Sequence, residues 1–249
     1  MNSGTSHPVE NAEYHFLVEE YYAVWKEAGL DEVPRVKLLP VSLRNPAPAP
    51  VTVRPPEVAK SFATSLPDLK MALSTCRRCA LSEGRQQVVF GVGHSHAPLM
   101  FVGEGPGQQE DSQGTPFLGE AGALLNKIIQ AMGLTRDSVY LTDVIKCRPF
   151  ITRPAREGEL AECSEFLRQQ IQLIRPKIVV ALGDSPASAL IGKPAPVAHS
   201  RGQFHSLTWN AEILVMATYP PKSLLQNPEL KRLVWDDMKL VKNKLGGAL

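Results

Sequence analysis

The sequence predicts an α/β fold in which a parallel sheet carries helices on both faces. Short apolar runs alternate with segments of helical periodicity from about residue 66 to residue 245, and this order favours parallel strands joined through helices. A glycine-rich turn directly follows the first of the core runs, as is common at the carboxyl edge of such a sheet. With 249 residues, 43% of them hydrophobic, the chain has enough apolar material for the core.

Four apolar runs are the expected core strands, and each leads into a turn or a helical segment. They comprise residues 99–102, 139–145, 177–182 and 212–217. After the first strand, one helical face collects Leu124, Leu125, Ile128, Ile129 and Met132, and Gly133 supplies a stop signal. Further helices are expected at residues 66–73, 163–174, 185–191 and 228–245.

The first quarter of the chain has a different composition. Residues 13–28 show helical periodicity that ends at Gly29, whereas residues 33–65 are rich in proline and predict an extended linker. We therefore expect a helical extension at 1–32, a linker at 33–65 and one domain at 66–249. The extension either binds a protein partner or packs back on the domain.

Bulk properties exclude some classes of protein. The formal net charge of +2 is too small to indicate a nucleic-acid-binding protein, although a local basic patch is compatible with it. No apolar run approaches the roughly 20 residues that span a bilayer, and the polar amino terminus has no apolar signal core. We expect a cytoplasmic monomer with reduced thiols and no membrane contact.

All four cysteines fall within the expected domain. Cys76 and Cys79 form a C-x-x-C pair, Cys147 follows the second strand, and Cys163 lies on the inward face of the next helix. Four thiolates can hold a tetrahedral zinc ion or an iron–sulfur cluster. The wide spacing of the second pair suits the larger cluster, but the sequence alone leaves both open.

The stretch G-E-G-P-G at residues 103–107 is the main candidate for a ligand-binding loop. It is not the dinucleotide fingerprint, because Pro106 removes one backbone N–H and we expect no helix directly after the third glycine. It is not a phosphate-binding Walker loop either, because no Lys-Ser or Lys-Thr pair follows. A purely structural turn remains an alternative.

The motifs together resemble the family 4 uracil-DNA glycosylases, the iron–sulfur type of bacteria and archaea. The resemblance covers residues 66–245 and rests on C-R-R-C-A-L-S-E-G-R (76–85), V-V-F-G-V-G (88–93), F-V-G-E-G-P-G-Q-Q-E-D (101–111), G-T-P-F-L-G-E-A-G-A-L-L (114–125), V-Y-L-T-D-V-I-K-C-R-P (139–149) and Q-N-P-E-L-K (226–231). It implies a three-layer α/β/α sandwich around a four-stranded parallel sheet. It also implies a structural 4Fe–4S cluster on Cys76, Cys79, Cys147 and Cys163.

The resemblance further implies base-excision repair by a monofunctional DNA glycosylase. Such an enzyme flips a uracil nucleotide out of DNA and hydrolyses its N-glycosidic bond. Phe117 matches the phenylalanine that stacks on the base, and Glu104, Gly105 and Gly107 match the loop beside base and sugar. Gly105 stands where the first-described glycosylase family has a catalytic aspartate, which family 4 also lacks. Glu110 and Asp111 follow the family pattern, but a solvated turn explains them equally well.

Two base-binding positions depart from the family pattern. Asp143 replaces the usual asparagine, whose amide donates to uracil O4 and accepts from N3–H. Pro220 replaces the histidine that stabilises charge on uracil O2, and Gln226 replaces a frequent arginine. These changes predict weak uracil excision or a shifted base preference. Lys222, His199 or His205 are candidates for rescue, and Asp143 itself could position the attacking water.

Contacts with DNA are easier to retain than catalysis. Leu224 and Leu225 match the loop that wedges into the duplex in place of the flipped base. The cations that we expect at phosphates are Arg77, Arg78, Arg85, Arg148, Lys222, Lys231 and Arg232. Two alternatives to the enzyme stay open: an iron–sulfur DNA-binding module of repair or replication that has lost catalysis, and a zinc-bound nucleotide hydrolase. Whether the chain is the glycosylase or the DNA-binding module, we expect it to associate with the nucleoid.

Overall fold

A mixed six-stranded sheet forms the centre of the part that the computed structural model describes, residues 63–149 and 155–246. The strand order is β1-β3-β2-β4-β6-β5. The four central strands are parallel, whereas β1 and β5 pair antiparallel at the two edges. The strands are β1 (Val92–Gly93), β2 (Leu99–Gly103), β3 (Tyr140–Asp143), β4 (Ile178–Leu182), β5 (Phe204–Leu207) and β6 (Asn210–Thr218).

The predicted four-stranded parallel sheet is therefore confirmed for the centre and incomplete at the edges. β1 has only two residues, too few to give a periodic signal. β5 is paired on one side only, and its first three residues are partly or fully exposed, so it lacks the buried apolar run by which the central strands were found. Its Ser206 and Leu207 also depart from regular pairing with β6.

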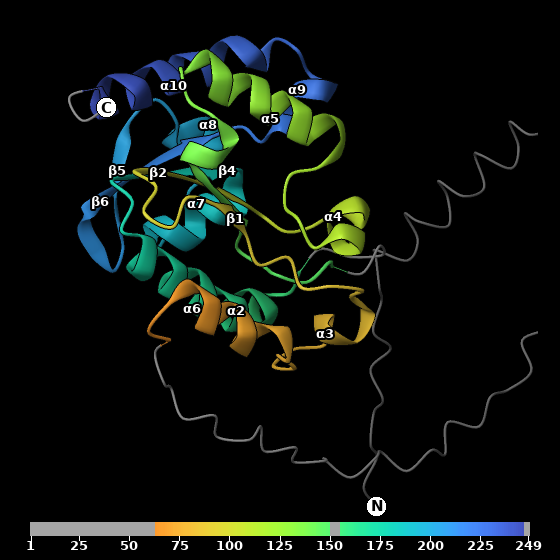
Figure 1. Cartoon of the computed structure of the whole chain (residues 1–249). Helices are drawn as coiled ribbons and strands as arrows, with labels where there is room; N and C mark the ends of the chain where they lie inside the picture. Colours follow the sequence, from red (N-terminus) through yellow and green to blue (C-terminus); the bar gives the residue numbers. More distant parts are fainter. Residues whose placement is uncertain (1–62, 150–154, 247–249) are drawn as a thin grey trace, which may run out of the picture. The chain divides into compact units, whose positions relative to one another are not determined.

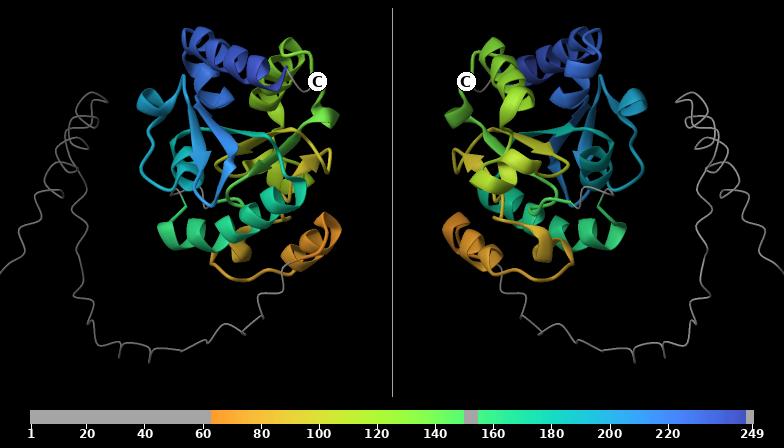
Figure 2. Two further views of the ribbon diagram at one scale, coloured as in Figure 1. Left: turned by 90° about the vertical axis from the view of Figure 1, so that its left-hand side faces the viewer. Right: turned by 90° about the vertical axis from the view of Figure 1, so that its right-hand side faces the viewer.

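Helices cover both faces of the sheet and complete three layers (Figures 1 and 2). One face packs against α6 and α7, through residues such as Leu167, Ile171 and Leu190. The other packs against α5, α9 and α10. The helices are α2 (Leu66–Ser74), α3 (Leu81–Gly84), α4 (Gln108–Gln113), α5 (Gly119–Ala131), η1 (Arg136–Ser138), α6 (Glu157–Ile174), α7 (Asp184–Ile191), α8 (Val197–Ser200), α9 (Pro221–Gln226) and α10 (Leu230–Leu245).

The strand β2 shows how alternation builds this sandwich. Met100 and Val102 belong to the core on the α6 side, whereas Leu99 and Phe101 belong to the core on the α5 side. All five residues of β2 are buried, as expected for a central strand with helices on both faces. The expected helices at 66–73, 163–174, 185–191 and 228–245 are confirmed, with ends shifted by a few residues.

Two short helices depart from the sequence prediction. α4 begins directly after Gly107, where we expected none, because the Glu110 carboxylate accepts the Gly107 N–H and caps the first turn. α9 begins at Pro221 and includes Leu224 and Leu225, which the resemblance places in a wedge loop; proline at the first helical position is favourable.

Some predictions fall outside the described residues. The expected helix at 13–28 and the expected linker up to residue 62 both lie outside the described residues. No helix in residues 63–149 and 155–246 combines the length and apolar character that a membrane span needs.

Candidate active site

A cavity of about 870 Å³ opens at the carboxyl ends of the parallel strands. The loop after β2 contributes residues 103–107, and the end of β3 contributes Asp143. Residues 183–185 after β4 and residues 219–223 after β6 line the opposite wall. Ligands of open α/β sheets bind at this edge, so the strand topology itself places the candidate site.

Phe117 and Asp143 meet at Gly103 in this cavity. A Cβ atom built on Gly103 would lie 2.3 Å from Asp143 Oδ1 and 2.8 Å from Phe117 Cζ. Only glycine at this position lets both the ring and the carboxyl group close on the end of β2. The sequence prediction that these two residues share one site is consistent with this arrangement, which offers an aromatic face beside a hydrogen-bonding edge.

The Glu110 carboxylate ties the two loops of the site together. Its Oε2 accepts from the Gly107 N–H at 3.1 Å, and its Oε1 accepts from the Leu118 N–H at 2.8 Å. Asp111 is 1% exposed and accepts from the backbone N–H groups of Gln86 and Gln87. A solvated turn does not describe Asp111, which is buried, whereas Glu110 is half-buried and accepts from two backbone N–H groups.

Among the described residues, the glycine-rich loop leaves the Gly105 N–H available to a ligand. The Gly107 N–H is engaged by Glu110, whereas the Gly105 N–H has no hydrogen-bond partner within residues 63–149 and 155–246. A Cβ on Gly105 would lie 2.4 Å from Ile145 Cγ1, so a side chain at this position would have to displace Ile145. The close approach explains why glycine stands here. Glu104 is exposed at the rim of the cavity.

The carboxyl group of Asp143 is buried without a hydrogen-bond donor among the described residues. The residue is 3% exposed. Burial raises the pKa of Asp143 to about 7; nearby Lys146 opposes the rise, whereas the negative charges of Glu110 and Glu104 add to it. Near neutral pH, a substantial share of Asp143 therefore carries its proton.

Lys146 is a buried cation beneath Asp143. Its Nζ donates to Thr142 Oγ1 at 2.6 Å, to the Asp143 carbonyl at 2.6 Å and to Gln170 Oε1 at 2.7 Å. Burial lowers the pKa of Lys146 to about 8. Three acceptors around a fully buried ammonium group fix the carboxyl end of β3, and so the backbone of Asp143. Sequence reasoning missed the role of this residue: Lys146 lies within the motif at 139–149, but nothing in the sequence shows that its side chain is buried.

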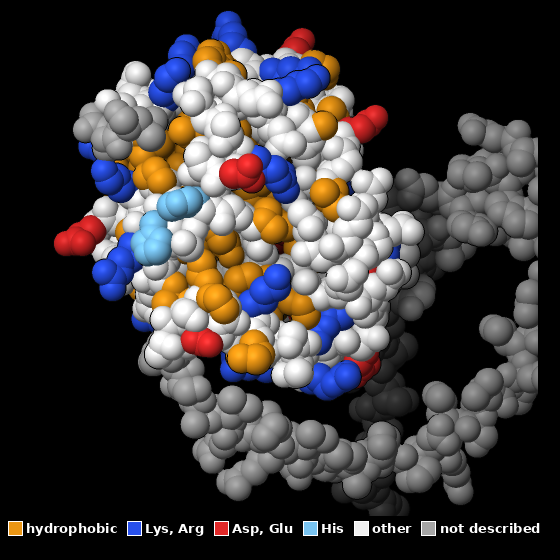
Figure 3. Space-filling model, in the orientation of Figure 1, with side chains coloured by type: hydrophobic (Ala, Val, Ile, Leu, Met, Phe, Trp, Pro, Cys, Tyr) orange, Lys and Arg blue, Asp and Glu red, His pale blue; other side chains and the backbone are white. Residues whose placement is uncertain are grey.

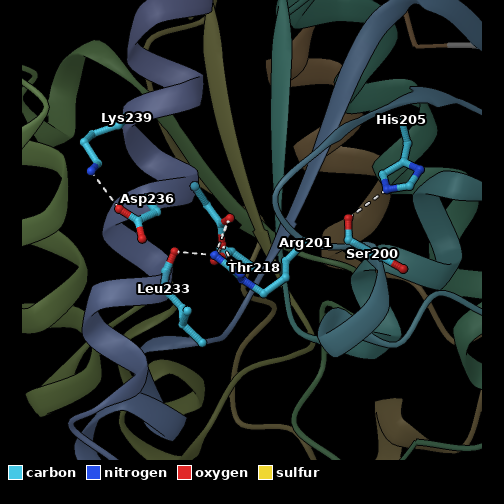
Figure 4. Close-up of polar contacts among 8 residues, drawn as sticks. Ser200, Arg201, His205, Thr218, Leu233, Asp236 and Lys239 are labelled. Atoms are coloured by element: carbon cyan, nitrogen blue, oxygen red, sulfur yellow. Dashed lines mark hydrogen bonds and ion pairs between the residues drawn. The ribbon is translucent and has the colours of Figure 1, made fainter.

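The loop after β6 brings Pro220 and Lys222 to the cavity wall. A buried network holds its base (Figure 4): the Thr218 hydroxyl donates to Asp237 Oδ2 at 2.6 Å, and the guanidinium of Arg201 pairs with Asp237 Oδ1 at 2.8 Å. Arg201 also donates to the Leu233 carbonyl at 2.7 Å. The start of this loop is thereby anchored to α10.

The two histidines that could have replaced the missing imidazole do not line the cavity. His205 belongs to β5, and one of its ring nitrogens lies 2.8 Å from the Ser200 carbonyl oxygen (Figure 4). His199 is exposed on α8. Of the candidates for rescue, Lys222 alone brings a positive charge to the wall of the described cavity.

The predicted wedge pair is divided by the fold. Leu224 is 1% exposed and packs into the core beneath α9, whereas Leu225 is 43% exposed. In this conformation only Leu225 is presented to a duplex. Lys and Arg side chains gather along the margin where Figure 1 places α10 and along the margin near α3 (Figure 3). The exposed cations of α10 are Lys231, Arg232, Lys239, Lys242 and Lys244.

The four cysteines come from three parts of the chain and form one neighbourhood. Cys147, Cys163 and Cys79 share a small apolar cluster with Leu81 and Ile145. Cys76 packs against a second cluster that includes residues of α2, and it is near enough to Cys147 to act on its charge. A hydrogen bond with the Cys163 thiol lowers the pKa of Cys79 to about 6, and burial raises the pKa of Cys147. Arg85 Nη1 donates to Cys147 Sγ at 3.1 Å.

Within residues 63–149 and 155–246, no three His, Cys, Asp or Glu side chains surround one metal-ion position. The donor set is nevertheless chemically uniform: four thiols, with a guanidinium that can stabilise thiolate charge. Soft thiolate ligands of this kind suit iron–sulfur clusters and zinc.

Sequence reasoning missed two further residues. Ser185 lines the cavity, and its Oγ is buried without a hydrogen-bond partner among the described residues. Arg136 lies outside the cavity lining but donates to the carbonyl oxygen of Phe117 at 3.4 Å. Neither lies within a recognisable motif, and only the folded chain brings them to the site.

Comparison with known proteins adds independent information. The family profile of the uracil DNA glycosylase superfamily matches residues 90–239, which include every residue of the cavity lining. A type-4 uracil-DNA glycosylase of Saccharolobus solfataricus is 40% identical over 178 residues, covering 68% of this chain and 82% of the relative. That of Sulfurisphaera tokodaii is 39% identical over 186 residues, covering 72% and 84%. That of Thermotoga maritima is 39% identical over 171 residues, covering 68% and 88%.

Proposed function

The chain belongs to the uracil-DNA glycosylase superfamily, and we propose that it removes uracil from DNA as a monofunctional glycosylase of the type-4 kind. The observation that carries the proposal is the convergence of Phe117 and Asp143 on Gly103 inside the cavity. A flat base needs one stacking face and one hydrogen-bonding edge, and these two side chains supply both. The nucleotide must leave the helical stack to reach them.

In the proposed complex, the Phe117 ring stacks on the base and Asp143 reads its Watson–Crick edge. A neutral carboxylic acid has one O–H donor and one carbonyl acceptor. It can therefore donate to uracil O4 and accept from N3–H, which is the pattern of the asparagine amide in related enzymes. Burial without a donor favours this neutral form of Asp143.

The reaction is hydrolysis of the bond between C1′ and N1. A water oxygen bonds to C1′ and the N1–C1′ electron pair leaves with the base, so uracil departs as an anion with charge shared by N1 and O2. The attacking water loses one O–H proton to solvent, and the uracil anion takes up one proton in return. We assign the stabilisation of this anion to the unused Gly105 N–H and to the Lys222 ammonium, which both belong to the cavity wall. Preorganised donors at developing charge are the largest usual contribution to such catalysis.

Pro220 offers no donor at the position where the family resemblance places a histidine. Loss of one such donor typically costs about 10²–10³ in rate. We therefore propose excision that is slower than in relatives with a histidine. The Glu104 carboxylate at the rim is the group best placed to orient the attacking water, because Asp143 is engaged with the base.

The four cysteines are proposed to hold a 4Fe–4S cluster, as the family resemblance implies. Cys76, Cys79, Cys147 and Cys163 supply four thiolates from three chain segments, so the group would brace the loop after α2 against β3 and α6. Its role is structural, and no step of the hydrolysis passes through it. Anaerobic purification with iron, sulfide and zinc analysis tests the assignment: a colourless zinc protein contradicts it.

DNA is the proposed partner, with Leu225 as the residue that fills the gap left by the flipped base. Single-turnover release of uracil from a defined oligonucleotide tests the proposal, with Phe117→Ala as the matched variant. Tight binding of DNA without release of uracil would instead support the inactive binding module.

A further inference from the structure

The backbone at Phe117 has a conformation that its surroundings must maintain. Its φ is +55°, in the left-handed region that residues other than glycine rarely adopt. The following residue is fixed by the hydrogen bond from the Leu118 N–H to Glu110. Gly122 packs so closely beneath the turn that a Cβ there would lie 2.0 Å from the Phe117 carbonyl oxygen. The ring can reach Gly103 only while this turn is held.

Arg136 holds the carbonyl side of the same turn. Its Nη2 donates to the Pro116 carbonyl, and its Nη1 donates to Asn126 Oδ1 at 3.0 Å, with a longer contact of 3.4 Å to the Phe117 carbonyl. The side chain forms no ion pair among the described residues, although Asp137 lies near enough to act on its charge. Its guanidinium is thus directed to two consecutive carbonyl groups and to α5.

We propose that Arg136 is a positioning residue for base recognition, because it fixes the turn that presents the Phe117 ring. The inference rests on the proposed stacking of Phe117 on the base. Arg136 does not line the cavity, so it acts through the ring and not on the nucleotide. Its planar fork matches two carbonyl oxygens at once, which the single ammonium group of lysine cannot do.

A double-mutant cycle between Arg136 and Phe117 tests the proposal in the full-length protein. The variants are Arg136→Met, Phe117→Ala and their combination, with Arg175→Met as the control, because Arg175 is an exposed arginine that also has a φ of +55°. Two quantities are measured: the single-turnover rate of uracil release, and the affinity for an oligonucleotide with 2′-fluoro-deoxyuridine relative to one with 2′-fluoro-thymidine, which has the same sugar. The fluorine slows cleavage, so this preference reports base recognition alone.

We expect Arg136→Met to reduce both quantities about tenfold, which is within the usual contribution of base–aromatic stacking. Affinity for the 2′-fluoro-thymidine oligonucleotide stays within about twofold, and Arg175→Met changes nothing. In the Phe117→Ala background, Arg136→Met has no further effect. Arg136→Lys reduces the rate and the preference less than Arg136→Met does. If Arg136→Met does not fold, Arg136→Lys takes its place in the cycle.

A second loss of similar size in the Phe117→Ala background overturns the proposal, because Arg136 would then act independently of the ring. An unchanged preference in Arg136→Met overturns it as well. A wild-type protein that prefers the fluorinated uridine but releases no uracil contradicts the proposed function, while the cycle in binding preference still decides the role of Arg136.

Discussion

The proton on Asp143 gives the most specific prediction, because it determines what the cavity can read. If a neutral Asp143 donates to uracil O4, excision must follow the protonated fraction of this side chain. With a pKa of about 7, that fraction falls from about 90% at pH 6 to about 10% at pH 8. The single-turnover rate should therefore decrease roughly tenfold for each pH unit above 7.

Asp143→Asn removes the titrating group and keeps the donor and acceptor pattern. We expect the variant to excise uracil at a rate that no longer decreases between pH 7 and pH 9, and to exceed the wild type at pH 8 by about tenfold. The charged groups that shift the pKa of Asp143, namely Lys146, Glu110 and Glu104, all remain in the variant.

The assay is single-turnover release of uracil from a single-stranded oligonucleotide at constant ionic strength. A single-stranded substrate removes the cost of unpairing, and constant ionic strength keeps phosphate contacts equal. A wild-type rate that rises with pH through 7 would refute the reasoning, because it would show an ionised Asp143 activating water. The same falling profile in Asp143→Asn would also refute it, since another group would then titrate.

Three further predictions address other parts of the site and the fold. Pro220→His restores an imidazole at the cavity wall and should raise the single-turnover rate by about 10²-fold; an unchanged rate would mean that the wall is not where charge develops on uracil O2. Gly122→Ala forces its Cβ against the Phe117 carbonyl and should reduce uracil excision about tenfold, with little change in the affinity for undamaged DNA; equal loss of both would point to general unfolding. Asp237→Ala leaves Arg201 without its buried partner and should lower the free energy of unfolding by about 3 kcal/mol, or the Tm by about 10 °C. The double variant Arg201→Met with Asp237→Leu removes both charges and should lose much less stability. Calorimetry of the two proteins makes the comparison.

The sequence predicted the layers of the fold well because the central strands are buried on both faces. β2 and β4 are continuous apolar runs, and α5 and α10 carry regular apolar stripes, so periodicity finds them. β5 escaped because three of its four residues are partly or fully exposed at the edge of the sheet. α4 escaped because all six of its residues are polar, and a carboxylate several positions along caps its first turn.

The site could be predicted only as far as motifs identify single residues. The resemblance located Phe117 and Asp143, but their common contact with Gly103 is a property of the folded chain. The wedge pair illustrates the limit: Leu224 and Leu225 are adjacent and chemically identical, and the helical turn of α9 buries one and exposes the other. Arg136 and Lys146 act through backbone carbonyls, for which no sequence pattern exists.

The central claim is that this cavity excises uracil by means of Phe117 and a neutral Asp143. Its most direct test is single-turnover release of uracil from one defined oligonucleotide at pH 6, by the wild-type protein and by Phe117→Ala. The account predicts complete release by the wild type and a rate at least about tenfold lower in the variant. Binding of the oligonucleotide without any release, or equal rates in the two proteins, would contradict it.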